Sequence, residues 1–99
     1  MYFKKNFKIG KKFVGKNHPC LIVAELSGNH GGSFSRVKKL ITQAKNSGAD
    51  LVKLQTYKPD SITLNSNKKD FKIIKNTPWK KNKNLWTLYN KSFTPWSWH

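Results

Sequence analysis

The first apolar residues of the chain lie on either side of Gly10 and predict a short β-hairpin within residues 1–19. They alternate loosely with polar residues: Phe3, Phe7, Ile9, Phe13 and Val14. His18 precedes Pro19, and proline favours an extended conformation in the residue before it. We therefore expect the hairpin to end at this pair.

A second pattern, in residues 20–57, predicts a strand, a helix and another strand. Residues 20–24 form a continuous apolar run that is typical of a strand buried on both faces, and Glu25 ends it. In residues 35–47 the apolar residues have the spacing of one helix face: Val37, Leu40, Ile41 and Ala44. Residues 50–57 predict the second strand. Together they form a βαβ unit, with parallel strands and a right-handed crossover.

Turn-forming residues mark the ends of the predicted helix. A glycine-rich turn, residues 27–33, leads into it, and Ser33 or Ser35 can cap its first turn. Gly48 suits the position just after the helix, where a left-handed conformation is common.

The rest of the chain is less regular. Residues 85–93 carry apolar side chains at helical spacing and predict a short helix: Leu85, Leu88, Tyr89 and Phe93. Thr94 followed by Pro95 predicts the start of a further helix, with threonine as the cap and proline at the first position.

Charge bears on the class of partner. The 20 Lys+Arg residues against 4 Asp+Glu residues give a net charge of +16, which first suggests nucleic acid. Only Arg36 is an arginine, and base recognition favours arginine for its bidentate fork. The lysines are spread along the chain with ten asparagines, a bias that AT-rich coding would produce. We therefore predict no nucleic-acid partner.

Membrane and secretory signals are weak as well. The chain contains no apolar run of about 18 residues that could span a bilayer, and no apolar segment follows the N-terminal lysines. Cys20 is the only cysteine, which suits a reducing compartment. We therefore predict a cytoplasmic protein without a membrane partner, and we expect Cys20 to pack in the core.

Lys53 breaks the apolar pattern of the second predicted strand. Burying an unpaired ammonium is costly, so such a lysine usually has a partner or a ligand. Alternation places Lys53 and Gln55 on one face, toward a barrel interior or the mouth of a sheet. Glu25 ends the preceding strand at the same edge, where parallel α/β sheets bind ligands. The three side chains predict a polar site for an anionic, hydroxylated ligand.

Simpler explanations stay open at this point. Glu25 and Lys53 can form an ion pair that merely joins adjacent strands, and the glycine-rich turn is better explained as a plain connection than as a phosphate loop. The three histidines have no metal-ligand spacing, and the four tryptophans are expected to serve packing.

Four stretches of sequence carry a family resemblance: residues 22–33 (IVAELSGNHGGS), 48–60 (GADLVKLQTYKPD), 70–73 (DFKI) and 94–99 (TPWSWH). In this order they resemble the sialic acid synthase family, and within it the pseudaminic acid synthase branch. Gly28 stands where that branch commonly has alanine, a mild departure.

The resemblance implies an α/β fold, the N-terminal part of a (β/α)₈ TIM barrel preceded by the hairpin. Residues 1–19 would form the hairpin and residues 20–99 the first βα units. The implied enzyme condenses phosphoenolpyruvate with 2,4-diacetamido-2,4,6-trideoxy-altrose to give pseudaminic acid and phosphate. It implies that a divalent metal, Mn or Mg, is held by ligands outside this chain, and that the full-length enzyme is a homodimer.

Site residues follow from the same resemblance. Glu25 would contact the sugar and assist proton transfer, and Lys53 would bind phosphoenolpyruvate. Gln55 would bind the sugar, and Asn29 fits the motif loop as a further substrate contact.

Two alternatives to this function are the sialic or legionaminic branch and a small basic nucleic-acid-binding protein. A (β/α)₈ barrel needs about 250 residues. We therefore expect the 99 residues to be an N-terminal fragment, inactive alone, with unpaired strand edges that favour aggregation.

Overall fold

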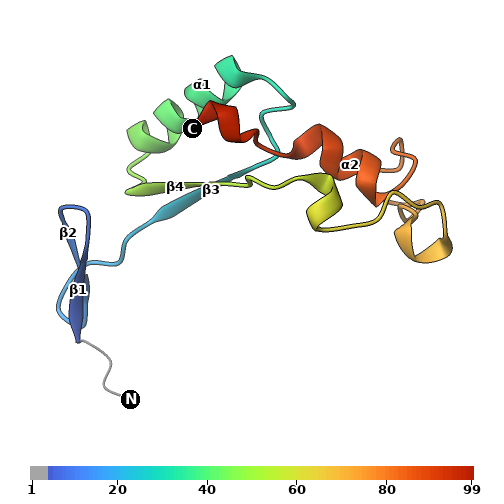
Figure 1. Ribbon diagram of the computed structural model, residues 1–99. Helices are drawn as coiled ribbons and strands as arrows, with labels where there is room; N and C mark the ends of the chain where they lie inside the picture. Colours follow the sequence, from blue (N-terminus) through green and yellow to red (C-terminus); the bar gives the residue numbers. More distant parts are fainter. Residues whose placement is uncertain (1–4) are drawn as a thin grey trace.

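The computed structural model describes residues 5–99 and begins with a β-hairpin. Strand β1 (Asn6–Ile9) pairs antiparallel with β2 (Lys12–Gly15), and Gly10 adopts a positive φ of 58° in the turn between them. Figure 1 shows this hairpin at one end of the molecule, apart from the helices.

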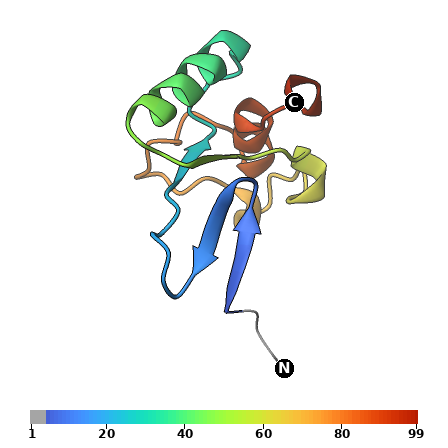
Figure 2. The same ribbon diagram turned by 90° about the vertical axis from the view of Figure 1, so that its left-hand side faces the viewer.

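The centre of the molecule is a βαβ unit, as the sequence predicted. Strand β3 (Val23–Ser27) and strand β4 (Leu51–Leu54) pair in parallel, and α1 (Phe34–Asn46) connects them. The Ser33 hydroxyl caps α1 by accepting a hydrogen bond from the Arg36 N–H, and Gly48 follows the helix at a φ of 91°. Figures 1 and 2 show α1 on one side of the strand pair.

The last part of the chain lies beyond the ends of β3 and β4 (Figure 1). It comprises two single-turn 3₁₀ helices, η1 (Pro59–Ser61) and η2 (Lys69–Phe71), followed by α2 (Leu85–Ser92) and a third 3₁₀ turn, η3 (Trp96–Trp98). The chain then ends near the start of α1, where the centroid of the Trp98 ring lies 5.6 Å from that of Phe34. None of the helices in residues 5–99 is both long enough and apolar enough to cross a membrane.

Both central strands differ from their predicted bounds: β3 begins at Val23 and not at residue 20, and β4 ends at Leu54 and not at residue 57. Residues 20–22 lie outside β3. At its start the Ile22 N–H donates to the Asp50 side chain, to Oδ2 at 2.8 Å, and the Ile22 carbonyl accepts from the Asp50 and Leu51 N–H groups. The expectation of a strand buried on both faces is wrong, since Val23 is 51% exposed. Cys20 is exposed too, so its predicted place in the core is also wrong.

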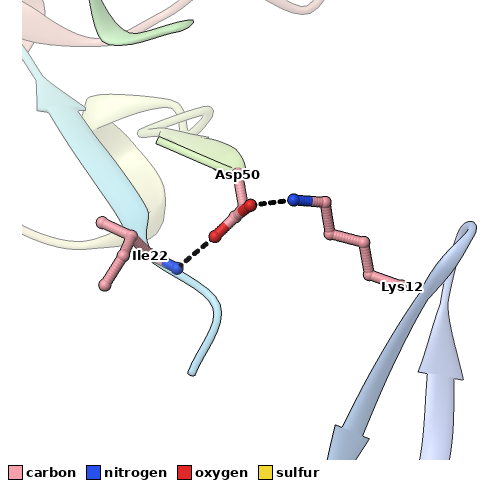
Figure 3. A network of polar contacts seen from close by, with 3 residues as sticks. All are labelled: Lys12, Ile22 and Asp50. Carbon is pink, nitrogen blue, oxygen red and sulfur yellow. Dashed lines mark hydrogen bonds and ion pairs between the residues drawn. The ribbon is translucent and has the colours of Figure 1, made fainter. Parts of the chain in front are cut away.

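Asp50 joins the hairpin to the central unit. Its carboxylate accepts hydrogen bonds from the Lys12 ammonium on β2 and from the Ile22 N–H before β3, and Figure 3 shows it between the two donors. These two bonds, with the Lys12 bond the larger effect, hold the Asp50 pKa below its usual value. The hairpin therefore meets the βαβ unit through an exposed polar contact.

Apolar and polar side chains share the few buried positions. Leu26, Val37 and Pro59 are the buried apolar residues among those described, whereas three polar residues are almost completely enclosed: His30, Asn84 and Thr94. Asn84 caps α2, because its Oδ1 accepts from the Thr87 N–H at 2.9 Å. Its Nδ2 donates back to the loop at residues 65–67, including the Ser66 carbonyl at 3.1 Å. This single side chain ties the loop to the helix.

Candidate functional site

Glu25 and Lys53 meet on neighbouring strands. They are direct partners in the parallel register, and Lys53 Nζ lies 2.8 Å from Glu25 Oε2. The other carboxylate oxygen of Glu25 accepts from the Ser27 N–H at 2.9 Å. The ammonium first and the backbone N–H second lower the pKa of Glu25, so this side chain is a carboxylate at neutral pH.

The pair is open to solvent. The Glu25 side chain is 39% exposed and the Lys53 side chain 65% exposed. The prediction that Lys53 faces a barrel interior concerns a complete barrel and stays a prediction. In the described chain, no segment covers this face of β3 and β4. An exposed ion pair contributes little to stability, which weakens the purely structural explanation of the two residues.

The backbone is irregular immediately after Glu25. The register shifts so that Glu25 faces Lys53 while Ser27 faces Leu54, leaving Leu26 as an extra residue in β3. Ser27 has a φ of 50°, a left-handed conformation that is uncommon outside glycine. Bulges and strained residues of this kind re-aim side chains and gather at functional sites. The pattern of apolar residues gave no sign of this bulge.

Asn29 and Gln55 share a hollow beyond the carboxyl ends of the strands. Its wall also includes Tyr57 and Ser92, together with Ser27, Gly28, Trp79, Leu88 and Tyr89. The Tyr57 hydroxyl lies 3.3 Å from Ser92 Oγ, linking the segment after β4 to the end of α2. Glu25 and Lys53 do not line this hollow. The four predicted residues therefore form two separate pairs.

Gly28 permits the close approach of α2 to this hollow. A Cβ at residue 28 would lie 2.5 Å from the Ser92 Cβ and 2.8 Å from the Ser92 carbonyl oxygen. Alanine, the residue common in the resembled branch, would therefore require the end of α2 to shift.

His30 has a larger role in the structure than its sequence position predicted. Its imidazole is completely buried, with Nε2 3.2 Å from Thr94 Oγ1 and Nδ1 accepting from the Gly32 N–H at 3.0 Å. Burial first, and the charge of Arg36 second, lower the pKa of His30. Thr94 itself does not cap a helix as expected, since η3 begins at Trp96 without a side-chain cap. The TPWSWH segment signalled a helix start, and nothing in it pointed to a partner for His30.

The tryptophans near the C-terminus differ in environment. Trp98 packs edge-on against His30, with 5.2 Å between ring centroids, and also contacts Phe34. Trp96 is 71% exposed. The packing role expected for the tryptophans thus holds for Trp98 and not for Trp96.

A divalent metal has no matching ligand set in the described part of the chain. Within residues 5–99, no three His, Cys, Asp or Glu side chains come together as a metal site would require. The family resemblance places the ligands of its metal outside this chain, so the metal stays a prediction.

Comparison of the sequence with known proteins identifies its family. Residues 40–99, more than half of the chain, match the NeuB family. The chain is 50% identical to a pseudaminic acid synthase of Campylobacter jejuni over 94 residues, which covers 95% of this chain and 25% of that protein. A pseudaminic acid synthase of Helicobacter pylori is 51% identical over 81 residues, covering 82% of this chain and 23% of the relative.

A more distant relative belongs to another branch. The N,N'-diacetyllegionaminic acid synthase of Legionella pneumophila is 45% identical over 53 residues, which is 54% of this chain and 15% of that enzyme. The chain thus spans about a quarter of the length of the pseudaminic acid synthases it resembles. On the match of residues 40–99, the chain belongs to the NeuB family.

Proposed function

We propose that this chain supplies the Glu25–Lys53 pair to the active site of a pseudaminic acid synthase. The reaction would join phosphoenolpyruvate to 2,4-diacetamido-2,4,6-trideoxy-altrose and release phosphate. One observation carries the proposal: half of the aligned residues are identical to pseudaminic acid synthases along nearly the whole chain. The identity to the legionaminic enzyme extends over about half of the chain, which favours the pseudaminic branch.

The exposed ion pair supports a role in chemistry. Glu25 and Lys53 lie near the carboxyl ends of parallel strands, where α/β sheets bind ligands. The Lys53 ammonium presents a compact positive charge to the phosphate and carboxylate of phosphoenolpyruvate. Within residues 5–99 its side chain is 65% exposed, and no buried position of the chain holds it away from such a ligand.

The proposed reaction begins with bond formation between two carbons. C3 of phosphoenolpyruvate attacks the aldehyde carbon of the open-chain sugar, and the aldehyde oxygen takes a proton to become a hydroxyl. Water then adds to C2 of the former enolpyruvyl group and loses a proton. Phosphate leaves with cleavage of the bond between C2 and oxygen, which forms the keto acid.

Glu25 is suited to the proton transfers of this scheme. The side chain is ionised at neutral pH, so its carboxylate has a free acceptor for the proton that the attacking water loses. Gln55 and Asn29 line one hollow, and their amide groups would hold hydroxyl and acetamido groups of the sugar. No step proposed for these residues uses a metal.

Further parts of the proposal concern the longer protein. Residues outside this chain would complete the (β/α)₈ barrel, cover the exposed face of β3 and β4, and supply the ligands of a Mn or Mg ion. We further propose a cytoplasmic homodimer, and a 99-residue chain that is inactive alone. The exposure of Val23, Leu51 and Val52 supports an additional layer of structure over these strands.

A pair of hybrid enzymes tests the proposal. This chain would replace its matched segment in the Campylobacter jejuni pseudaminic acid synthase and, separately, in the Legionella pneumophila legionaminic enzyme. We expect phosphate release from phosphoenolpyruvate by the Campylobacter hybrid with the altrose-derived sugar, and much weaker activity of the Legionella hybrid with its own acceptor. An inactive but folded Campylobacter hybrid, or the reverse ranking, would overturn the proposal.

A further inference from the structure

His30 is enclosed by three parts of the chain. Its ring makes an edge-to-face contact with Trp98. Its Nδ1 accepts a hydrogen bond from the Gly32 N–H, and its Nε2 is hydrogen-bonded to the Thr94 hydroxyl. The nearest charged group is Arg36 on α1, whose Nη1 donates to the His30 carbonyl at 3.4 Å. The other titratable group of the C-terminal turn, His99, bonds Thr56 instead.

Hydrogen bonding assigns the tautomer of this imidazole. Nδ1 accepts the Gly32 N–H and so carries no proton. In the neutral ring the proton is then on Nε2, which donates to Thr94 Oγ1. A doubly protonated ring would lose the Gly32 bond and place a charge in a fully buried site.

Thr94 connects the imidazole to the end of β4. Its side chain is as completely buried as that of His30, and its N–H donates to the Gln55 carbonyl at 2.8 Å. Gln55 is the first residue after β4, where the pairing with β3 has ended. The Thr94 N–H therefore bonds a Gln55 carbonyl that lies outside the sheet. Asn29, which shares the hollow with Gln55, directly precedes His30.

We propose that His30 is a positioning residue, whose neutral imidazole holds Thr94 and thereby fixes the backbone of Gln55 beside Asn29. The inference rests on the proposed function in one respect only, the role of Gln55 in binding the amino sugar. Through Thr94, His30 sets the direction in which the Gln55 amide enters the hollow.

Two substitutions separate the two hydrogen bonds of the ring. Asparagine is short and can offer an oxygen near the place of Nδ1, so His30→Asn keeps an acceptor for Gly32 and loses the donor to Thr94. Glutamine reaches further and can offer an N–H near the place of Nε2, so His30→Gln keeps the bond to Thr94. Thr94→Val removes the hydroxyl at nearly constant shape, and Thr94→Ser is the matched control that retains it.

Amide hydrogen exchange in the full chain, at low micromolar concentration to limit association, tests the connection. We expect His30→Asn and Thr94→Val to speed exchange of the residue 94 amide about 10-fold. His30→Gln and Thr94→Ser should leave that amide close to the native rate, while His30→Gln speeds the Gly32 amide. Unchanged exchange at residue 94 in His30→Asn, or an unprotected Thr94 amide in the native chain, would overturn the proposal.

Kinetics in the Campylobacter hybrid supply a second readout. His30→Asn should raise the apparent KM for the amino sugar several-fold and leave that for phosphoenolpyruvate unchanged, with rescue by His30→Gln. Equal changes in both KM values would contradict a positioning role toward Gln55. A native hybrid that releases no phosphate would instead contradict the proposed function, whereas the exchange experiment tests the link from His30 to Gln55 by itself.

Discussion

Glu25 and His30 lie five positions apart and differ in almost every physical respect. Glu25 shares an exposed ion pair with Lys53 on the strand face, whereas His30 is neutral, buried and bonded on both ring nitrogens. The buried polar side chains are thus hydrogen-bonded within the chain, while the proposed catalytic pair is exposed in residues 5–99. Substitutions of the buried polar residues should mainly affect folding, and substitutions of Glu25 or Lys53 should mainly affect chemistry.

The largest expected effect belongs to the accessible pair. Glu25→Gln in the Campylobacter hybrid removes the carboxylate that takes a proton, and should lower kcat by about 10²- to 10⁴-fold. In the 99-residue chain by itself the same substitution should hardly change the melting temperature, because the Glu25 side chain is exposed there. An assay of phosphate release measures kcat, and thermal denaturation measures the melting temperature. A large loss of stability with normal kcat would reverse the distinction between the two regions.

A buried anchor should show the opposite behaviour. Asn84→Ala removes the cap of α2 and leaves the Ser66 carbonyl and the Thr87 N–H without their partner. We expect the free energy of unfolding to fall by about 1–3 kcal/mol. Urea denaturation of the chain measures this change, with the exposed Asn90→Ala on the same helix as control. Equal effects of the two substitutions would show that the Asn84 network contributes nothing.

Acid should weaken the buried region before the exposed one. Burial lowers the pKa of His30, so below about pH 6.5 the unfolded chain binds a proton that the native chain does not, and stability falls with pH. Glu25 and Asp50 have lowered pKa values as well, and their contribution is lost only below about pH 4.5. The free energy of unfolding is measured across pH 4–8. Its fall between about pH 6.5 and pH 4.5 should be absent in His30→Gln and present in His18→Gln. A retained slope in His30→Gln would exclude His30 as its source.

The smallest effect is expected at the contact between the hairpin and the central unit. Lys12→Ala removes one of the two donors to Asp50, both of them at the surface (Figure 3). Chymotrypsin cleavage near Leu21 should become about two-fold faster, because exposed ion pairs contribute little. Lys11→Ala is the neighbouring control. A ten-fold change would mean that this contact holds the hairpin more firmly than an exposed pair can.

Local patterns predicted the elements well where neighbouring residues decide the structure. The hairpin turn at Gly10 and the parallel pairing of β3 with β4 follow from residue type and spacing, as does a serine cap before α1, which the structure places at Ser33 of the two candidates. The bounds of the strands did not follow from local patterns, because the Ile22 N–H bonds the Asp50 side chain and a bulge at Leu26 shifts the register before the last pair, Ser27 with Leu54. Contacts across 28 residues, such as Ile22 with Asp50, leave no periodic signal.

The candidate site was predictable only where its residues interrupt a local pattern. Lys53 interrupts an apolar strand, and the parallel register brings it to Glu25. The bond between His30 and Thr94 spans 64 positions, and neither residue breaks a local pattern. Asn84 is one of ten asparagines, and AT-rich coding predicts no special role for any of them. Its side chain nevertheless makes more hydrogen bonds than that of any other described asparagine.

The apparent KM for phosphoenolpyruvate in the Campylobacter hybrid tests the central claim most directly. Lys53→Ala should raise it at least about 10-fold, because a charged hydrogen bond to the ligand is lost. Lys45→Ala, at the end of α1, is the matched control and should leave the apparent KM at its native value. A KM in Lys53→Ala equal to that of the control would contradict the claim that the Glu25–Lys53 pair binds substrate.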